Sequence, residues 1–188
     1  MATHVALLRG INLGGHNRVA MADLRELAAS LGHTGVATYI QSGNVLFSTK
    51  YSDTAAMAAA FEEAIARTLG VRAGVVVLSR ADLEQVVRDN PYPDEANAKA
   101  VHAVFLSGDP GQDALDRIAA AQREAARKGS RDTATVTGRT LYLHTPDGFG
   151  RSDLAAALTR AGGASLPGVT ATARNWATVT KLLALCDA

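Results

Sequence analysis

Short apolar runs in the first half of the chain predict β-strands. The runs at residues 4–8 and 75–78 have the length of buried strands and are far shorter than the roughly 18 residues that a membrane span needs. Two further segments rich in β-forming residues, 36–41 and 45–48, flank Ser42-Gly43-Asn44. A small polar tripeptide between two such segments is typical of a hairpin turn.

Helical spacing appears between and after these strands. Apolar residues three and four positions apart over 21–31 predict one amphipathic helix, and an Ala-rich stretch over 53–69 predicts a second, which Gly70 ends. A third helix is expected to run from Ser79, a natural N-cap, through Val87. The first half is thus predicted as strand–helix–strand–strand–helix–strand, followed by one more helix.

The second half repeats this order of elements. Its predicted strands span 100–106, 133–137, 140–144 and 169–173, and its predicted helices span 113–128, 152–160 and 175–185. The offset between matching elements is nearly constant, as from His4 to His102 and from Val75 to Val169. A repeated order of elements at a fixed offset indicates an internal structural repeat.

The pattern predicts an α+β fold of two tandem ferredoxin-like βαββαβ units, each followed by a helix. Such units place their helices on one face of an antiparallel sheet. The first unit and its trailing helix are assigned to 1–90, and the second unit and the C-terminal helix to 99–188. Residues 91–98 are polar, contain proline and are predicted to connect the two.

Composition excludes several classes of protein. The chain has 188 residues, of which 47% are hydrophobic and 20% charged, so it is not a disordered chain. A formal net charge of +1 disfavours a strongly basic nucleic-acid binder. The single cysteine, Cys186, allows neither an internal disulfide nor a cysteine-based metal cluster. With no basic leader and no apolar span, the expected location is the cytoplasm.

Three motifs, in order along the chain, carry a resemblance to a known family. They are residues 8–17 (LRGINLGGHN), 38–45 (TYIQSGNV) and 172–182 (TARNWATVTKL), with supporting matches at Met21, 90–93 and 150–152. Over nearly its whole length the chain resembles the bacterial family known as domain of unknown function 1697. The resemblance implies paired ferredoxin-like units. It brings no established activity, so it assigns no catalytic residue.

The loop over residues 9–18 is the first candidate binding segment. It follows a strand and precedes a helix, a position from which backbone amides and a helix N-terminus can face an anion. Gly14 and Gly15 permit close approach, and Arg9 or Arg18 can add charge. The candidate ligand-binding residues of this loop are Arg9, Asn12, Gly14, Gly15 and Asn17. The alternative is a loop that needs glycine only to turn.

A second candidate segment is the hairpin tip, where Gln41, Ser42 and Asn44 could supply neutral hydrogen-bond donors. The alternative is a polar turn without a ligand. Ser42 does not lie in a G-x-S-x-G motif, so a serine hydrolase is not supported.

The remaining candidates lie near the C-terminus. Arg151 and Ser152 open a predicted helix, where Ser152 can equally serve as N-cap. Arg174 and Asn175 leave the last strand and are expected to be exposed, whereas Trp176 is expected in the core. Within one half, the end of the first strand and the 42–44 turn need not meet. We therefore expect the second half to bring Arg174 toward Arg9 and Asn44.

These residues predict a binder of a small anionic or phosphorylated ligand in a cleft between the two repeats. The alternative is a non-catalytic interaction module that contacts a protein or a nucleic acid. Nucleic acid is disfavoured because the predicted sheet offers only Phe47 over 43–49 for base stacking. No catalytic motif, no metal site and no cofactor is predicted, and the sequence assigns neither a reaction nor an oligomeric state.

Overall fold

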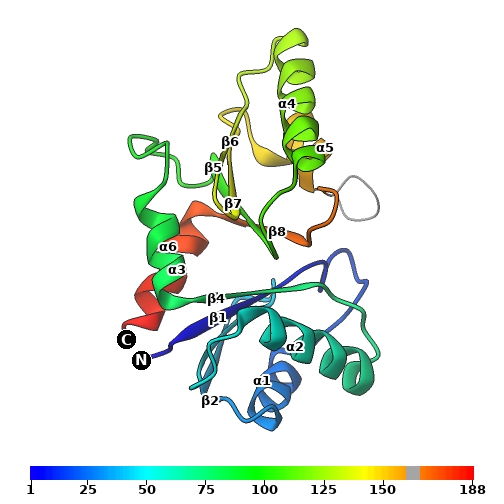
Figure 1. The fold of residues 1–188 in the computed structure, drawn as a ribbon, viewed down its shortest axis with the longest axis vertical. Helices are drawn as coiled ribbons and strands as arrows, with labels where there is room; N and C mark the ends of the chain where they lie inside the picture. The colour runs from blue at the N-terminus through cyan, green and yellow to red at the C-terminus, as the bar shows by residue number, and fades with distance from the viewer. Residues whose placement is uncertain (160–165) are drawn as a thin grey trace. The chain divides into compact units, whose positions relative to one another are not determined.

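The computed structural model describes residues 1–159 and 166–188. The chain forms two compact units (Figure 1). The first comprises Met1–Gln85 together with Lys181–Ala188, and the second comprises Val86–Thr180. The division predicted from the sequence, into 1–90 and 99–188 with a connection over 91–98, stays a prediction.

The first unit is a four-stranded antiparallel sheet with two helices on one face (Figure 1). Its elements are β1 (His4–Leu8), α1 (Met21–Ser30), β2 (Thr34–Tyr39), β3 (Asn44–Ser48), α2 (Thr54–Leu69) and β4 (Val75–Ser79). The strands lie in the order β2-β3-β1-β4. The helix α3 (Arg80–Arg88) follows directly, and the boundary between the compact units falls within it.

Both faces of the strands β1, β3 and β4 are buried, whereas the edge strand β2 is exposed or half-buried. Ala6, Leu8 and Phe47 pack with residues of α1 and α2 such as Leu24 and Phe61 in one core cluster. The alternate residues of the strands, among them Val5, Leu7, Leu46 and Val76, are at most 3% exposed as well. Because successive strand side chains point to opposite faces, two buried faces explain the uninterrupted apolar runs in the sequence.

The second unit has the same order of strands and helices. Its elements are β5 (Val101–Leu106), α4 (Gln112–Arg127), β6 (Thr133–Thr137), β7 (Thr140–His144), the short 3₁₀ helix η1 (Phe149–Arg151), α5 (Asp153–Thr159), β8 (Ala171–Asn175) and α6 (Trp176–Cys186). The antiparallel sheet has the order β6-β7-β5-β8. The predicted α+β class and the predicted hairpin over 133–137 and 140–144 are confirmed.

Two predicted strands are displaced by about two residues. The last strand begins at Ala171 rather than 169, because the amide of Val169 closes a turn onto the Leu166 carbonyl. β2 ends at Tyr39 rather than 41, since Ile40 leaves the strand with a left-handed φ of 50°. The sequence places Gly162 and Gly163 just after the predicted helix over 152–160, and both lie outside the described residues.

Side-chain caps fix several helix starts. The Ser79 hydroxyl accepts from the Asp82 amide while the Asp82 carboxylate accepts from the Ser79 amide, which confirms the predicted cap of α3. Ser152 and Asn175 cap α5 and α6 by accepting from the amides of Ala155 and Thr178. These bonds satisfy amides that a helix start otherwise leaves unpaired.

The last helix, α6, is buried along part of its surface, and Trp176, expected in the core, is among its half-buried residues. Val179 and Leu182 are fully buried, whereas Trp176 and Leu183 are half-buried. Cys186 is also fully buried, and burial raises the pKa of its thiol, so it packs as a small apolar side chain.

No helix among the described residues is long and apolar enough to cross a membrane.

Candidate functional site

The loop over residues 9–18 folds as a miniature hairpin. The His16 amide donates to the Leu13 carbonyl at 2.9 Å, and the Asn12 amide donates to the Asn17 carbonyl at 3.0 Å. Gly14 and Gly15, at the tip, have φ values of 55° and 85°. A two-residue turn with both φ values positive favours glycine, so the shape of the turn accounts for both glycines.

Asn12 ties this loop to its neighbours. Its amide nitrogen donates to the carbonyls of Val19 and Gln41 at 3.0 and 2.9 Å, and its Oδ1 accepts from the Val19 amide at 2.9 Å. Asn17 reinforces the loop by donating to the Gly10 carbonyl at 3.0 Å. The side chains of these two candidate binding residues therefore shape the loop, and they hold it against the turn between β2 and β3.

That turn packs directly on the end of β1. The Leu8 amide donates to the Gly43 carbonyl at 2.8 Å, and Leu7 lies opposite Asn44 in the β1–β3 ladder. The expectation that the end of the first strand and this turn need not meet within one half is wrong. The sheet order places β3 beside β1, so the end of β1 and the turn before β3 lie at the same end of the two neighbouring strands.

The polar residues of the turn differ in exposure. Asn44 is fully buried, and its amide nitrogen donates to the Tyr39 carbonyl and to the Ser42 hydroxyl at 2.9 and 3.0 Å. Asn44 and Ser42 thus stabilise the turn from within. Gln41 is exposed, so of the three candidate residues it is the one whose side chain stands in solvent.

The loop, the turn and the residue before α1 line an open pocket of about 440 Å³, which we call the anion pocket. It is lined by Asn12, Gly15, Arg18, Val19, Ala20 and Gln41. Three of the predicted binding residues, Asn12, Gly15 and Gln41, are therefore brought together. Arg18, which the sequence indicated only as a source of charge, lies among them.

Two features make this pocket electropositive. Arg18 is exposed and makes no ion pair within residues 1–159 and 166–188. Ala20 occupies the N-cap of α1, and an alanine has no side-chain acceptor for the first amides of the helix. Those amides and the helix dipole favour an anion at this end. Asp23, the acidic residue in the first turn of α1, competes with a bound anion for these amides.

The sequence also contains a signal for this uncapped helix start. Residues 18–20 (Arg-Val-Ala) precede the helix and contain none of the Ser, Thr, Asp or Asn residues that usually cap one. A helix without its own cap leaves amide donors for a ligand or for water.

The candidates in the second unit have structural contacts. Arg174 is only 7% exposed, and its Nη1 donates to the Thr172 hydroxyl and to the Ala173 carbonyl at 2.9 and 2.8 Å. Burial lowers its pKa to about 10. The expected exposure of Arg174 is therefore wrong: its side chain is on the sheet face opposite Ala171, which packs in the helix-covered core. Ser152 is buried, and Arg151 is exposed.

The predicted meeting of Arg9, Asn44 and Arg174 stays a prediction, because these residues belong to different compact units. Arg9 is half-buried, and its backbone amide donates to the Gly74 carbonyl.

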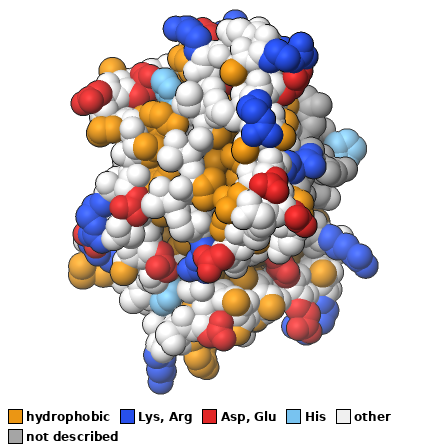
Figure 2. Space-filling model, turned by 45° about the horizontal axis from the view of Figure 1, so that its top comes forward, with side chains coloured by type: hydrophobic (Ala, Val, Ile, Leu, Met, Phe, Trp, Pro, Cys, Tyr) orange, Lys and Arg blue, Asp and Glu red, His pale blue; other side chains and the backbone are white. Residues whose placement is uncertain are grey.

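Among the residues the structure describes, no three His, Cys, Asp or Glu side chains gather as metal ligands would. Figure 2 shows basic and acidic side chains interspersed over the visible face.

Comparison with known proteins identifies the class of this chain. Residues 1–142 match the family described as "Protein of unknown function (DUF1697)". The chain belongs to this family, which confirms the resemblance drawn from its motifs. A search of the curated proteins found no match.

The fold has a solved relative. The structure of the conserved bacterial protein SP0830 from Streptococcus pneumoniae is similar with a TM-score of 0.70 and 23% sequence identity, over 98% of each chain. At that identity the similarity extends to the fold alone. Neither comparison assigns a biochemical function.

Proposed function

We propose that this protein binds a small anionic or phosphorylated ligand in the anion pocket. One observation carries the proposal: Arg18 and Ala20, the N-cap residue of α1 that supplies no side-chain cap, line the same pocket of about 440 Å³. A guanidinium and a helix N-terminus are two independent sources of positive potential. The volume lies in the range of small-molecule sites, about 300–1,000 Å³.

Each lining residue has a distinct part in this proposal. Amides of the first turn of α1 donate to the anion, and Arg18 adds a charge-assisted hydrogen bond. Gly15, without a side chain, leaves room for an oxygen close to the backbone. Gln41 supplies a neutral polar group at the rim. Asn12 holds the loop against the turn by donating to the Gln41 carbonyl.

The wider fold and site are part of the same proposal. We infer that both units are ferredoxin-like, which the shared βαββαβ order and the matching strand orders support. Arg9, Arg174 and Asn175, with Arg151 and Ser152, stay predicted contributors from outside the anion pocket. Because Ser152 and Asn175 already cap helices, Arg9 and Arg151 are the stronger of these candidates.

The proposal is tested by titrating the protein with pyrophosphate while the amide resonances of Gly15, Ala22 and Asp23 are followed by NMR. Saturable shifts at these amides are expected. Arg18→Gln should weaken binding about tenfold or more, the size of one charge-assisted hydrogen bond. Asp23→Asn should tighten it, because the competing carboxylate is removed.

Arg67→Gln on α2 is the matched control, since it removes the same charge from a residue that pairs with Glu63 on the surface. It should leave binding unchanged apart from a small salt-dependent loss. Equal weakening by Arg18→Gln and Arg67→Gln would show that only net charge matters, and absence of shifts at α1 would refute the proposal. A thermal-shift panel of nucleotides and phosphorylated metabolites then identifies the ligand class.

A second candidate function is contact with a partner protein through the same loops. Leu13 and Ile40 are 60% and 49% exposed, and each adjoins one end of the Asn12–Gln41 hydrogen bond. Ile40 has a φ of 50°, which is strained for a β-branched residue. Because asparagine tolerates this left-handed backbone, Ile40→Asn should raise the melting temperature. If these side chains serve a partner, Ile40→Asn and Leu13→Ser should both abolish its co-purification.

A further inference from the structure

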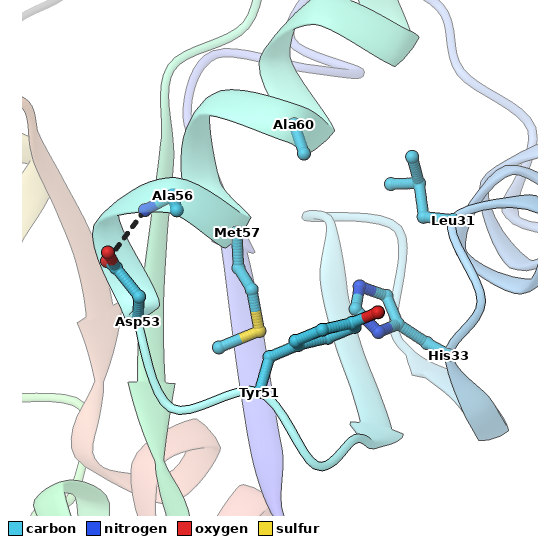
Figure 3. A pocket seen from close by; sticks show the side chains of 7 residues that line it. All are labelled: Leu31, His33, Tyr51, Asp53, Ala56, Met57 and Ala60. Atoms are coloured by element: carbon cyan, nitrogen blue, oxygen red, sulfur yellow. Dashed lines mark hydrogen bonds between the residues drawn. The ribbon is translucent and has the colours of Figure 1, made fainter.

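A second pocket lies in the first unit, at the other end of β2 and β3. It has a volume of about 250 Å³ and is formed by the residues just before β2, the segment between β3 and α2, and the first two turns of α2 (Figure 3). Its lining residues are Leu31, His33, Tyr51, Asp53, Ala56, Met57 and Ala60. We call it the His33 pocket. The anion pocket lies beyond Tyr39, at the opposite end of β2.

His33 is the one nitrogen-bearing side chain in this lining. It is 6% exposed, and its ring packs on Phe47 and Phe61 with centroids 4.3 and 5.4 Å apart. Its Nδ1 is buried and has no hydrogen-bond partner among the described residues. Figure 3 shows the ring set between Tyr51 and Leu31, with an edge toward the space bounded by Met57 and Ala60.

The protonation of His33 follows from these surroundings. Burial, aided by the nearby His4, lowers the pKa of His33, so the imidazole is neutral near pH 7. A neutral imidazole carries one N–H donor and one acceptor nitrogen. A buried unpaired N–H is rarer in proteins than an under-satisfied acceptor. This favours the tautomer with hydrogen on Nε2, which leaves Nε2–H as the donor for the pocket.

The rest of the lining is apolar except at the rim. Leu31, Met57, Ala56 and Ala60 supply hydrocarbon, and the ring of Tyr51 forms one wall. The Asp53 carboxylate accepts from the Ala56 amide at 2.9 Å as the N-cap of α2. A carboxylate at the rim disfavours an anionic ligand, so this pocket differs in charge from the anion pocket.

We propose that the His33 pocket binds a small neutral aromatic molecule that carries one hydrogen-bond acceptor, with Nε2 of His33 as the donor. An apolar cavity of about 150 Å³ binds benzene in another protein, so about 250 Å³ accommodates one substituted ring. Phe47 and Phe61 hold the imidazole in place from behind. This proposal is independent of the anion pocket and stands whether or not that pocket binds an anion.

The test compares phenol with toluene, which have nearly the same shape and differ in one hydroxyl. Amide resonances of Ala56, Met57 and Ala60 are followed by NMR in the full-length protein. We expect saturable shifts with both molecules, and phenol should bind about three to ten times more tightly, as one neutral hydrogen bond implies. His33→Phe should abolish this preference and leave toluene binding in place.

Two alanines of α2 supply a matched pair of variants. Ala60→Leu adds three carbon atoms at the pocket lining and should block both molecules. Ala59→Leu changes an exposed alanine outside the lining and should not block them. Both keep a strong helix former. The proposal is overturned if no saturable shift occurs up to about 10 mM, where a millimolar Kd would be evident. It is equally overturned if binding survives Ala60→Leu, or if phenol keeps its preference in His33→Phe.

Discussion

Gly43 shows how a single residue sets the geometry of the anion pocket. It has a φ of 77°, and a Cβ added there would lie 2.7 Å from Cδ1 of Ile11 and 2.8 Å from Cβ of Leu8. Both neighbours are buried core residues at the end of β1 and the start of the following loop. Any side chain at this position would push the turn away from the loop.

We therefore expect Gly43→Ala to lower the free energy of unfolding by about 2–4 kcal/mol, from left-handed backbone strain and overpacking together. Gly14→Ala is the control, because its φ is 55° but nothing lies within 4 Å of its added Cβ. It should cost only the backbone strain, about 1–2 kcal/mol. Urea unfolding measures both, and equal losses would contradict the close approach at Gly43.

A half-buried histidine in the second unit, His102, predicts a pH dependence. The His102 ring stacks on Phe149 with centroids 3.9 Å apart, its Nδ1 is buried without a partner among the described residues, and burial lowers its pKa to about 4. The unfolded chain therefore takes up a proton that the folded chain does not. The contribution of neutral His102 to the free energy of unfolding is fully present above pH 6.5 and is lost as the pH falls toward 4.

The loss attributable to His102 should reach about 3 kcal/mol by pH 4, at 1.4 kcal/mol for each pKa unit. His102→Phe should remove most of this dependence, while His16→Gln, in an exposed loop, should not. Urea unfolding at pH 7 and pH 4 compares the variants. His4 and His33, whose pKa values burial also lowers, add to the slope in the same direction. An unchanged slope in His102→Phe would exclude His102 as its source.

Residue-level predictions from the sequence succeeded where local chemistry decides. Ser79 was predicted as a cap from its position alone, and the Ser152 alternative of capping was likewise visible. Asn12 and Asn44 were predicted to bind a ligand, and in the structure their amide nitrogens donate to backbone carbonyls, Asn12 to Gln41 and Asn44 to Tyr39. A sequence without the tertiary fold does not distinguish a polar residue that faces a ligand from one that holds a loop.

At the scale of elements, the periodicity of apolar residues predicted the strands and helices to within a few positions. It did not predict which strands are neighbours, and so it missed that β3 adjoins β1. That neighbour relation brings the 9–18 loop and the β2–β3 turn together to form the anion pocket. Strand order follows from how the helices cross over the sheet, which the spacing of apolar residues within each element does not report.

The strand β8 illustrates the same limit and yields a prediction. Arg174, expected in solvent, is buried and donates to the Thr172 hydroxyl. Arg174→Ala should therefore destabilise the fold by about 2–5 kcal/mol, as removal of a large buried side chain does, rather than leave it intact. Arg151→Ala, at an exposed arginine of the same unit, is the control. A normal melting temperature for Arg174→Ala would show that the arginine is not structurally required.

At the scale of the whole molecule, the first compact unit is built from both ends of the chain. The Ala2 amide donates to the Cys186 carbonyl at 3.0 Å, and Arg80 pairs with Asp187 at 2.6 Å. Leu182 and Cys186 are fully buried. The sequence predicted the repeated order of elements and a helix over 175–185. It did not reveal that residues 181–188 complete the first unit, because contacts between chain ends leave no local periodicity.

This arrangement predicts that the C-terminus stabilises a unit that lies mostly at the N-terminus. Deletion of 181–188 removes Leu182 and Cys186 from the core, which should lower the free energy of unfolding by about 3–5 kcal/mol. Amide hydrogen exchange should accelerate first in β1, whose neighbouring residue Ala2 loses its acceptor. Deletion of 187–188 alone removes the surface ion pair between Arg80 and Asp187 and leaves the pair between Arg80 and Glu84, so it should change the melting temperature little. If the longer deletion instead accelerated exchange only in the second unit, residues 181–188 would not be part of the first.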